Sequence, residues 1–200
     1  MQLILISLNF DNRKVIRNEF NVLDNEILIG NVGRMMPQKN QAFLIKVFAK
    51  YHKINLNTKL MIINDGPLLQ ALQALAKELN VFDSVIFVGP KADLYKYYSA
   101  FDLFTLPSIY EGLGIVLIEA QANGLKCIAS MNVPTEVDGT GNIEFVKLDE
   151  DEWLKTLIRV SYSRNEWNDC RDKLIAAKYD IDEAAKELEV IYRQTLKSNK

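Results

Sequence analysis

Short runs of apolar residues alternate along the chain with segments whose apolar positions recur at helical spacing. The runs of strand length are 26–35, 59–65, 84–89, 101–107, 126–130 and 142–148. Between them lie segments such as 39–53, where apolar residues three and four apart define one helix face. Alternating helices and wholly apolar strands predict a parallel sheet covered on both faces. We therefore expect an α/β fold with a doubly wound, Rossmann-like parallel sheet and C-terminal helices.

The composition is that of a soluble folded domain and disfavours several functional classes. With 200 residues, 48% hydrophobic and 25% charged, the chain can form one domain with a sizeable core. Its net charge of −2 argues against bulk attraction to nucleic acid, although a local basic site stays open. No apolar run is long enough to span a membrane, and the first residues do not resemble a signal peptide. Cys127 and Cys170 lack ligand-type spacing, so we expect reduced core thiols in a cytoplasmic protein.

Ligands of doubly wound sheets bind beyond the carboxyl ends of the strands, which directs attention to the loops there. After the first strand, Arg34 and Lys39 place two cations at the start of a helix, where they could hold a phosphate group. Two solvated surface cations would explain this pair equally well. The next loop, 64–67, is explained by a turn with a helix cap. The dinucleotide fingerprint and the P-loop motif are both missing, which disfavours those two kinds of site.

The third loop, within 108–124, has two carboxylates eight residues apart, Glu111 and Glu119, in an apolar and glycine-rich run. If a helix begins near Leu113, the backbone N–H groups of 112–115 form an anion site that a ligand can approach closely. Glu119, roughly 9 Å further along the helix axis, could accept hydrogen bonds from sugar hydroxyls beside that anion. A surface acid and a helix cap are the simpler explanations. The apolar neighbours of Glu119 and the poor capping ability of glutamate disfavour them.

Taken together, three segments resemble the nucleotide-binding half of retaining GT-B glycosyltransferases of the group 1 class, glycosyltransferase family 4. They are "NVGRMMPQKNQAFLIKVFAKY", "IINDGPLLQALQALAKELNVFDSVIFVG" and "YYSAFDLFTLPSIYEGLGIVLIEAQANGLKCIAS". The most diagnostic part is the E-x7-E motif formed by Glu111 and Glu119. The segment "NVPTEVDGTGNIEFVKLDEDEWLKTL" is similar to members that build capsular and exopolysaccharides. Asn64 and Phe10 depart from the family pattern, which has glycine at the corresponding places in many members.

The resemblance implies a role for each loop. Arg34 and Lys39 would hold the donor diphosphate as it leaves, Glu111 would contact the transferred sugar, and these three residues would be catalytic. Glu119 would hold the ribose hydroxyls, and the base would lie near Gly89 and Pro90. The donor-binding residues expected in this way are Gly33, Arg34, Lys39, Gly89, Pro90, Glu111, Gly112, Leu113, Gly114, Ile115 and Glu119. Because cations and amides would neutralise the diphosphate, we expect no metal and no cofactor beyond the UDP- or GDP-linked sugar substrate.

A GT-B enzyme has two Rossmann-like halves, and the resemblance covers one of them. We expect residues 1–24 to form a strand and a polar connection that enters from a missing N-terminal, acceptor-binding half. Residues 25–178 would be the donor-binding domain, and residues 179–200 would be a helix that crosses back. The chain would then be a domain excised from a longer enzyme or one part of a split enzyme, and inactive alone.

The function implied by the resemblance is transfer of a sugar from a nucleoside-diphosphate sugar to a saccharide or lipid-linked acceptor in polysaccharide biosynthesis. No nucleic-acid partner is expected, and the location would be the cytoplasm or the inner face of the membrane, with peripheral association through the missing half. Two alternatives stay open: a nucleotide-sugar-binding module of a split enzyme and a sugar-nucleotide epimerase of related fold. An epimerase needs further acid or base groups, yet the chain has one histidine, His52, which we expect to lie too far along its helix to reach the cleft.

Overall fold

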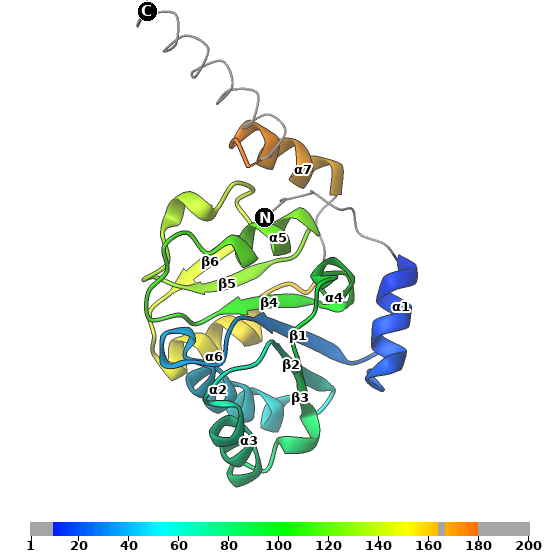
Figure 1. Cartoon of the computed structure of the whole chain (residues 1–200), viewed down its shortest axis with the longest axis vertical. Helices are drawn as coiled ribbons and strands as arrows, with labels where there is room; N and C mark the ends of the chain where they lie inside the picture. Colours follow the sequence, from blue (N-terminus) through cyan, green and yellow to red (C-terminus); the bar gives the residue numbers. More distant parts are fainter. Residues whose placement is uncertain (1–9, 164–166, 180–200) are drawn as a thin grey trace, which may run out of the picture.

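The computed structural model describes residues 10–163 and 167–179 of the 200-residue chain. Within these residues, six parallel strands form a single sheet in the order β3-β2-β1-β4-β5-β6 (Figure 1). The strands are β1 (Ile27–Val32), β2 (Thr58–Ile63), β3 (Val85–Val88), β4 (Leu103–Leu106), β5 (Cys127–Ser130) and β6 (Ile143–Val146). This order confirms the predicted doubly wound sheet, in which the chain proceeds outward from the centre in both directions.

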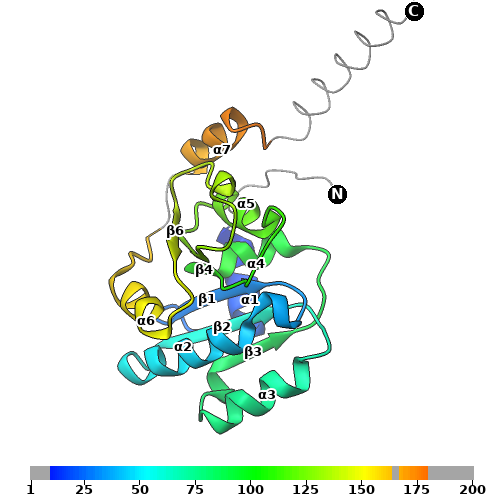
Figure 2. The ribbon, with the colours of Figure 1, turned by 90° about the vertical axis from the view of Figure 1, so that its left-hand side faces the viewer.

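Helices cover both faces of the sheet. Figures 1 and 2 show α2, α3 and α6 on one face and α1, α4 and α5 on the other, with α7 stacked against α5. The helices are α1 (Phe10–Glu19), α2 (Gln41–Ile54), α3 (Leu69–Glu78), α4 (Leu94–Ala100), α5 (Ile115–Ala122), α6 (Glu150–Arg159) and α7 (Trp167–Ala176), with single turns η1 (Pro37–Lys39), η2 (Phe82–Ser84) and η3 (Thr135–Val137). No helix among the described residues has the length and apolar character needed to cross a membrane.

The two layers of helices explain why most strand residues are apolar on both faces of the sheet. Successive side chains of a strand point to opposite faces, so both faces of this sheet need apolar residues. In β1, Leu28 belongs to the core under α1, α4 and α5, whereas Ile29 belongs to the core under α2, α3 and α6. Met61 and Leu60 divide in the same way in β2. The continuous apolar runs in the sequence therefore report burial on both sides.

The N-terminal segment differs from its prediction. Residues expected to form a polar connection instead form α1, which packs against α4. Ion pairs as well as apolar contacts hold α1 against the sheet, because Arg13 and Arg17 of α1 both pair with Asp102 at the start of β4. The strand expected in residues 1–9 and the helix expected in 180–200 lie outside the described residues.

The order in which strands are added to the sheet reverses between β1 and β4, and polar side chains hold these two strands together. The two strands pair directly only at Ile29↔Leu103 and Gly30↔Phe104. Beyond that register, Asn31 Nδ2 donates to Thr105 O at 2.9 Å, and Thr105 Oγ1 donates to Gly30 O at 3.0 Å. The carboxyl ends of β1 and β4 are thereby held side by side. The loops that follow them begin at the place where doubly wound sheets bind ligands.

Candidate functional site

The loops that follow β1 and β4 are bonded to each other through both main chain and side chains. Ile109 N–H donates to Gln38 O at 2.8 Å, and Gln38 Nε2 donates to Tyr110 O at 2.9 Å. Lys39 Nζ lies 2.6 Å from Glu111 Oε1, although the two residues are 72 positions apart. The structure therefore brings together the predicted cation of one loop and the predicted carboxylate of the other.

Glu111 is held inside its loop by two donors. Its side chain is 7% exposed, and Oε1 accepts hydrogen bonds from Lys39 Nζ and from Ser108 Oγ, each at 2.6 Å. The residue before α5 is Gly114, so Glu111 is not the cap of that helix. Ser108 was missed by the sequence analysis, although a serine three residues before a glutamate in a tight loop is a local signal for such a bond.

Arg34 differs from Lys39 in its surroundings. Its side chain is exposed and makes no ion pair with the rest of the described chain. The main chain beneath it is fixed, because Gln41 Nε2 donates to Gly33 O at 3.2 Å and to Arg34 O at 3.3 Å. Gln41 is buried at the start of α2 and is a further residue that the sequence analysis missed. A guanidinium on a fixed backbone is thus available to a ligand.

At the loop 64–67, the hydrogen-bonded turn lies slightly later than predicted, where Leu69 N–H donates to Gly66 O at 3.2 Å, and the predicted helix cap is wrong. The residue that precedes α3 is Leu68, and it makes no side-chain capping bond. Instead the loop supports the Arg34 loop, since Met35 N–H donates to Asp65 O at 2.7 Å and Leu68 N–H donates to Met35 O at 3.1 Å. A Cβ on Gly66 would lie 2.3 Å from Met35 O, so only glycine allows this close approach.

The helix after β4 begins two residues later than predicted, at Ile115 rather than near Leu113. Gly114 precedes it in the left-handed conformation (φ 83°), which glycine adopts without strain. None of the backbone N–H groups of residues 112–115 donates a hydrogen bond within the described part of the chain. Together with the helix dipole, these free N–H groups can receive an anion. The local geometry is therefore compatible with the anion site expected from the sequence.

Glu119 lies on a helix that is buried on most sides, as predicted. Leu117, Ile118 and Ala120 are inaccessible, whereas Glu119 is half-buried. Burial raises the pKa of the Glu119 carboxyl, and the hydrogen bond from the Tyr98 hydroxyl to Oε2, at 2.7 Å, partly offsets that rise. The carboxylate thus has an internal partner on α4 that the sequence analysis did not identify.

Gly89 and Pro90 are exposed at the carboxyl end of β3, two strands away from β1. They share this edge of the sheet with the other loops. Asn64 N–H donates to Val88 O at 2.9 Å and ties the end of β3 to the loop at 64–67. Gly89 and Pro90 therefore lie at the same end of the sheet as the other loops, on the outer side of the loop at 64–67.

His52 lies at the opposite edge of the sheet from these loops. Its Nδ1 is 2.8 Å from Thr58 Oγ1 at the start of β2, and its Nε2 is 3.1 Å from Ser84 Oγ just before β3. Strands begin at this edge, whereas the candidate site lies where strands end. The placement agrees with the prediction that His52 does not serve the cleft, and it weakens the epimerase alternative.

The free energy of unfolding is expected to fall as the pH drops below about 6.5, with His52 responsible. Burial lowers the pKa of His52, an effect that Glu26 and the backbone bond at Thr58 only partly offset. Because the folded pKa is below the unfolded value, the contribution is present above pH 6.5 and is lost as the pH falls through the folded pKa. Urea unfolding at several pH values measures it, and His52→Gln should remove the slope between pH 6.5 and 5. An unchanged slope in that variant would assign it to carboxyl groups.

The strand order and the loops that meet at its reversal define a Rossmann-like domain, a class that binds ligands at this edge. Within that class, the chain belongs to the family described as glycosyl transferases group 1, whose sequence model matches residues 12–161. The predicted family relationship is thereby confirmed at this level.

Two curated relatives of this chain are much longer than the chain itself. A protein named as glycosyltransferase EpsF of Bacillus subtilis is 36% identical over 140 residues, which cover 68% of this chain and 36% of that protein. The UDP-Gal:alpha-D-GlcNAc-diphosphoundecaprenol alpha-1,3-galactosyltransferase of Escherichia coli is 30% identical over 169 residues, which cover 76% and 41% of the two chains. The chain therefore spans well under half the length of these relatives.

A solved structure agrees with the fold. HepE of Anabaena, in complex with UDP and glucose, superposes with a TM-score of 0.79 at 18% identity, over 96% of this chain and 55% of that one. At this identity the likeness establishes the fold alone. It agrees with the interpretation of this chain as one Rossmann-like part of a GT-B architecture.

Proposed function

We propose that this domain binds the nucleoside diphosphate of a nucleotide-sugar donor at the edge formed by the carboxyl ends of β1 and β4. The observation that carries the proposal is the contact between Lys39 and Glu111 beside the free N–H groups of 112–115. A cation, unpaired amides and a helix N-terminus together suit a polyanion. Membership of a glycosyltransferase family supplies the reaction class.

The proposed binding mode uses each loop for one part of the donor. Arg34 and Lys39 contact the diphosphate, and the amides of 112–115 bind the same phosphates or the transferred sugar. Positive groups fixed before the reaction stabilise the charge that develops on the diphosphate as its bond to the anomeric carbon breaks. These groups take the place of a metal ion. Glu111 contacts the sugar, Glu119 accepts hydrogen bonds from the ribose hydroxyls, and the main chain at Gly89 and Pro90 faces the base.

We further propose that the whole protein transfers the sugar, with retention of configuration, to a saccharide or lipid-linked acceptor in polysaccharide biosynthesis. The name of the Escherichia coli relative, which specifies UDP-Gal and a diphosphoundecaprenol-linked acceptor, supports a nucleotide-sugar donor and a lipid-linked acceptor. An acceptor half would complete the cleft, because the acceptor hydroxyl must be held against the anomeric carbon. Without that half the present chain is expected to bind donor and not to transfer it. The proposed location is the cytoplasm, at the inner face of the membrane.

Isothermal titration calorimetry with UDP, GDP and inorganic pyrophosphate, each in the presence of a chelator, tests the donor site. We expect one of the nucleotides to bind without a divalent ion. Glu119→Gln should weaken nucleotide binding by roughly 10- to 100-fold, as expected for a charged hydrogen bond, while pyrophosphate binding stays unchanged. Glu78→Gln, an exposed change on α3, is the matched control. Binding that requires magnesium or manganese would overturn the proposed mode.

A further inference from the structure

We infer that Tyr98 is a positioning residue that orients the Glu119 carboxylate for recognition of the donor ribose. This inference rests on the proposed function, since it assigns a supporting residue to the same site. Tyr98 belongs to α4 and Glu119 to α5, and the Tyr98 hydroxyl donates to Glu119 Oε2 at 2.7 Å. Tyr98 itself would not touch the ligand.

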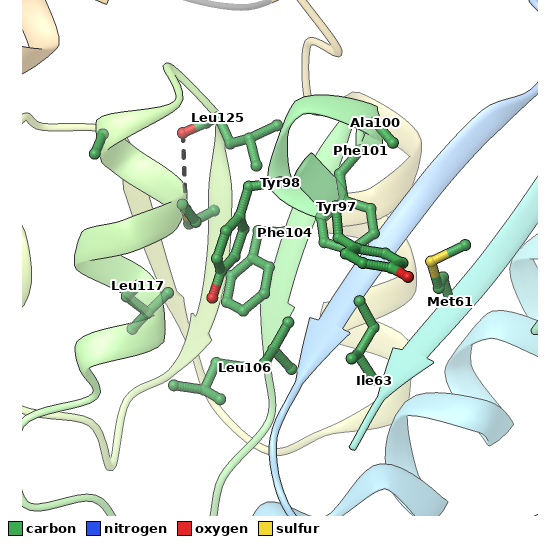
Figure 3. Packing of buried hydrophobic residues seen from close by; sticks show 14 of the residues in the cluster. Met61, Ile63, Tyr97, Tyr98, Ala100, Phe101, Phe104, Leu106, Leu117 and Leu125 are labelled. Atoms are coloured by element: carbon green, nitrogen blue, oxygen red, sulfur yellow. Dashed lines mark hydrogen bonds between the residues drawn. The ribbon is translucent and has the colours of Figure 1, made fainter. Parts of the chain in front are cut away.

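The phenol ring of Tyr98 has little freedom to move. The residue is 1% exposed, and its ring packs at 5.6 Å from the ring of Phe104 and, edge to face, at 6.0 Å from the ring of Phe101. Figure 3 shows the ring between α5, near Leu117, and the strand that contains Phe104 and Leu106. Since a ring in such packing cannot adopt another rotamer without a clash, the hydroxyl is a fixed donor.

A fixed donor determines which carboxylate oxygen is left for a ligand. Oε2 of Glu119 accepts the bond from Tyr98, and Oε1 has no hydrogen-bond donor among the described residues. A carboxylate offers about four lone-pair sites, so Oε1 retains the capacity to accept from hydroxyl groups. With Oε2 anchored, the side chain need not lose rotamer freedom when the ligand arrives.

The same hydrogen bond keeps the carboxylate in the form that can accept. Burial raises the pKa of Glu119, and the bond from Tyr98 acts against that rise. Burial first, and then the nearby Glu119 and Cys127, raise the pKa of the Tyr98 hydroxyl well above its usual value. Tyr98 therefore remains protonated and donates, and its hydrogen bond favours the charged form of Glu119.

The test compares Tyr98→Phe with Tyr97→Phe. Both tyrosines are buried on α4, but Tyr97 packs toward β2, beside Met61 and Ile63 (Figure 3). Calorimetry should show that Tyr98→Phe weakens UDP binding by roughly 3- to 10-fold, the effect of one lost hydrogen bond, and leaves pyrophosphate binding unchanged. Its loss of UDP affinity at low pH should also begin at higher pH, because Glu119 then takes up its proton more readily. Tyr97→Phe should alter neither property.

Three outcomes separate the possibilities. The Tyr98→Phe variant could be less stable and still keep the wild-type ratio of UDP to pyrophosphate affinity and the wild-type pH profile. That result would show that Tyr98 stabilises the fold and does not orient Glu119. Wild-type protein that binds neither UDP nor GDP would overturn the proposed function and this inference together. If Tyr98→Phe does not fold, NMR of the wild-type hydroxyl proton decides: it should persist in the UDP complex, and its loss would mean that Glu119 moves away on binding.

Discussion

Replacement of Asp102 by alanine is expected to lower the free energy of unfolding by about 3–5 kcal/mol, because it leaves a buried cation without its counter-charge. The side chain of Arg17 is 2% exposed, and its Nη1 lies 3.1 Å from Asp102 Oδ2. Arg13 Nη2 donates to Asp102 Oδ1 at 2.7 Å. The variant also deprives the Leu28 N–H at the start of β1 of its bond to Asp102 Oδ2 at 2.7 Å.

Urea unfolding followed by circular dichroism measures this loss, and Asp93→Ala is the matched control. Asp93 pairs with Lys96 at 2.8 Å on the surface, where water screens the two charges and the pair contributes little to stability. Asp102 lies at the edge where strands begin, so folded Asp102→Ala protein should bind UDP as the wild type does. Equal destabilisation by the two substitutions would show that the Arg17 pair is not the link between α1 and the sheet.

The fold could be predicted from the sequence because burial on both faces imposes a strong pattern. Strand β2 ends in four consecutive buried apolar residues, 60–63, and a helix such as α2 keeps one apolar face. The position of α1 could not be predicted in this way. Its attachment depends on Arg17, and a charged residue gives no apolar signal in the sequence even when its side chain is fully buried.

The candidate site could be predicted loop by loop, but its contacts could not. The rule that ligands bind at the carboxyl ends of strands located Arg34, Lys39 and Glu111 at one edge. The pairing of Lys39 with Glu111 depends on β1 and β4 being neighbours, which follows from the strand order and from no local pattern. The partner of Glu119 was missed for the same reason, since the order of the strands brings α4 and α5 into contact and no local pattern in the sequence indicates that contact.

Lys39→Met is expected to weaken binding of UDP and pyrophosphate alike by about 10- to 100-fold, because it removes one charge-assisted contact to the phosphates. The same change leaves the Glu111 carboxylate, 7% exposed, with Ser108 as its remaining donor in the loop. The free energy of unfolding should therefore also fall, by about 1–3 kcal/mol. Calorimetry and urea unfolding measure the two effects separately, and Lys46→Met, an exposed change on α2, is the control.

The double variant Lys39→Met/Glu111→Gln distinguishes a phosphate contact from an ion pair that only stabilises the loop. Removing the negative charge of Glu111 relieves the unpaired buried carboxylate, so the double variant should regain most of the stability that Lys39→Met loses. Pyrophosphate has no sugar for Glu111 to contact, so its affinity depends on the cation and should stay low in the double variant. If stability and pyrophosphate affinity recover together, Lys39 acts on the ligand only by holding the Glu111 loop, and the phosphates must be bound by Arg34 and the amides of 112–115.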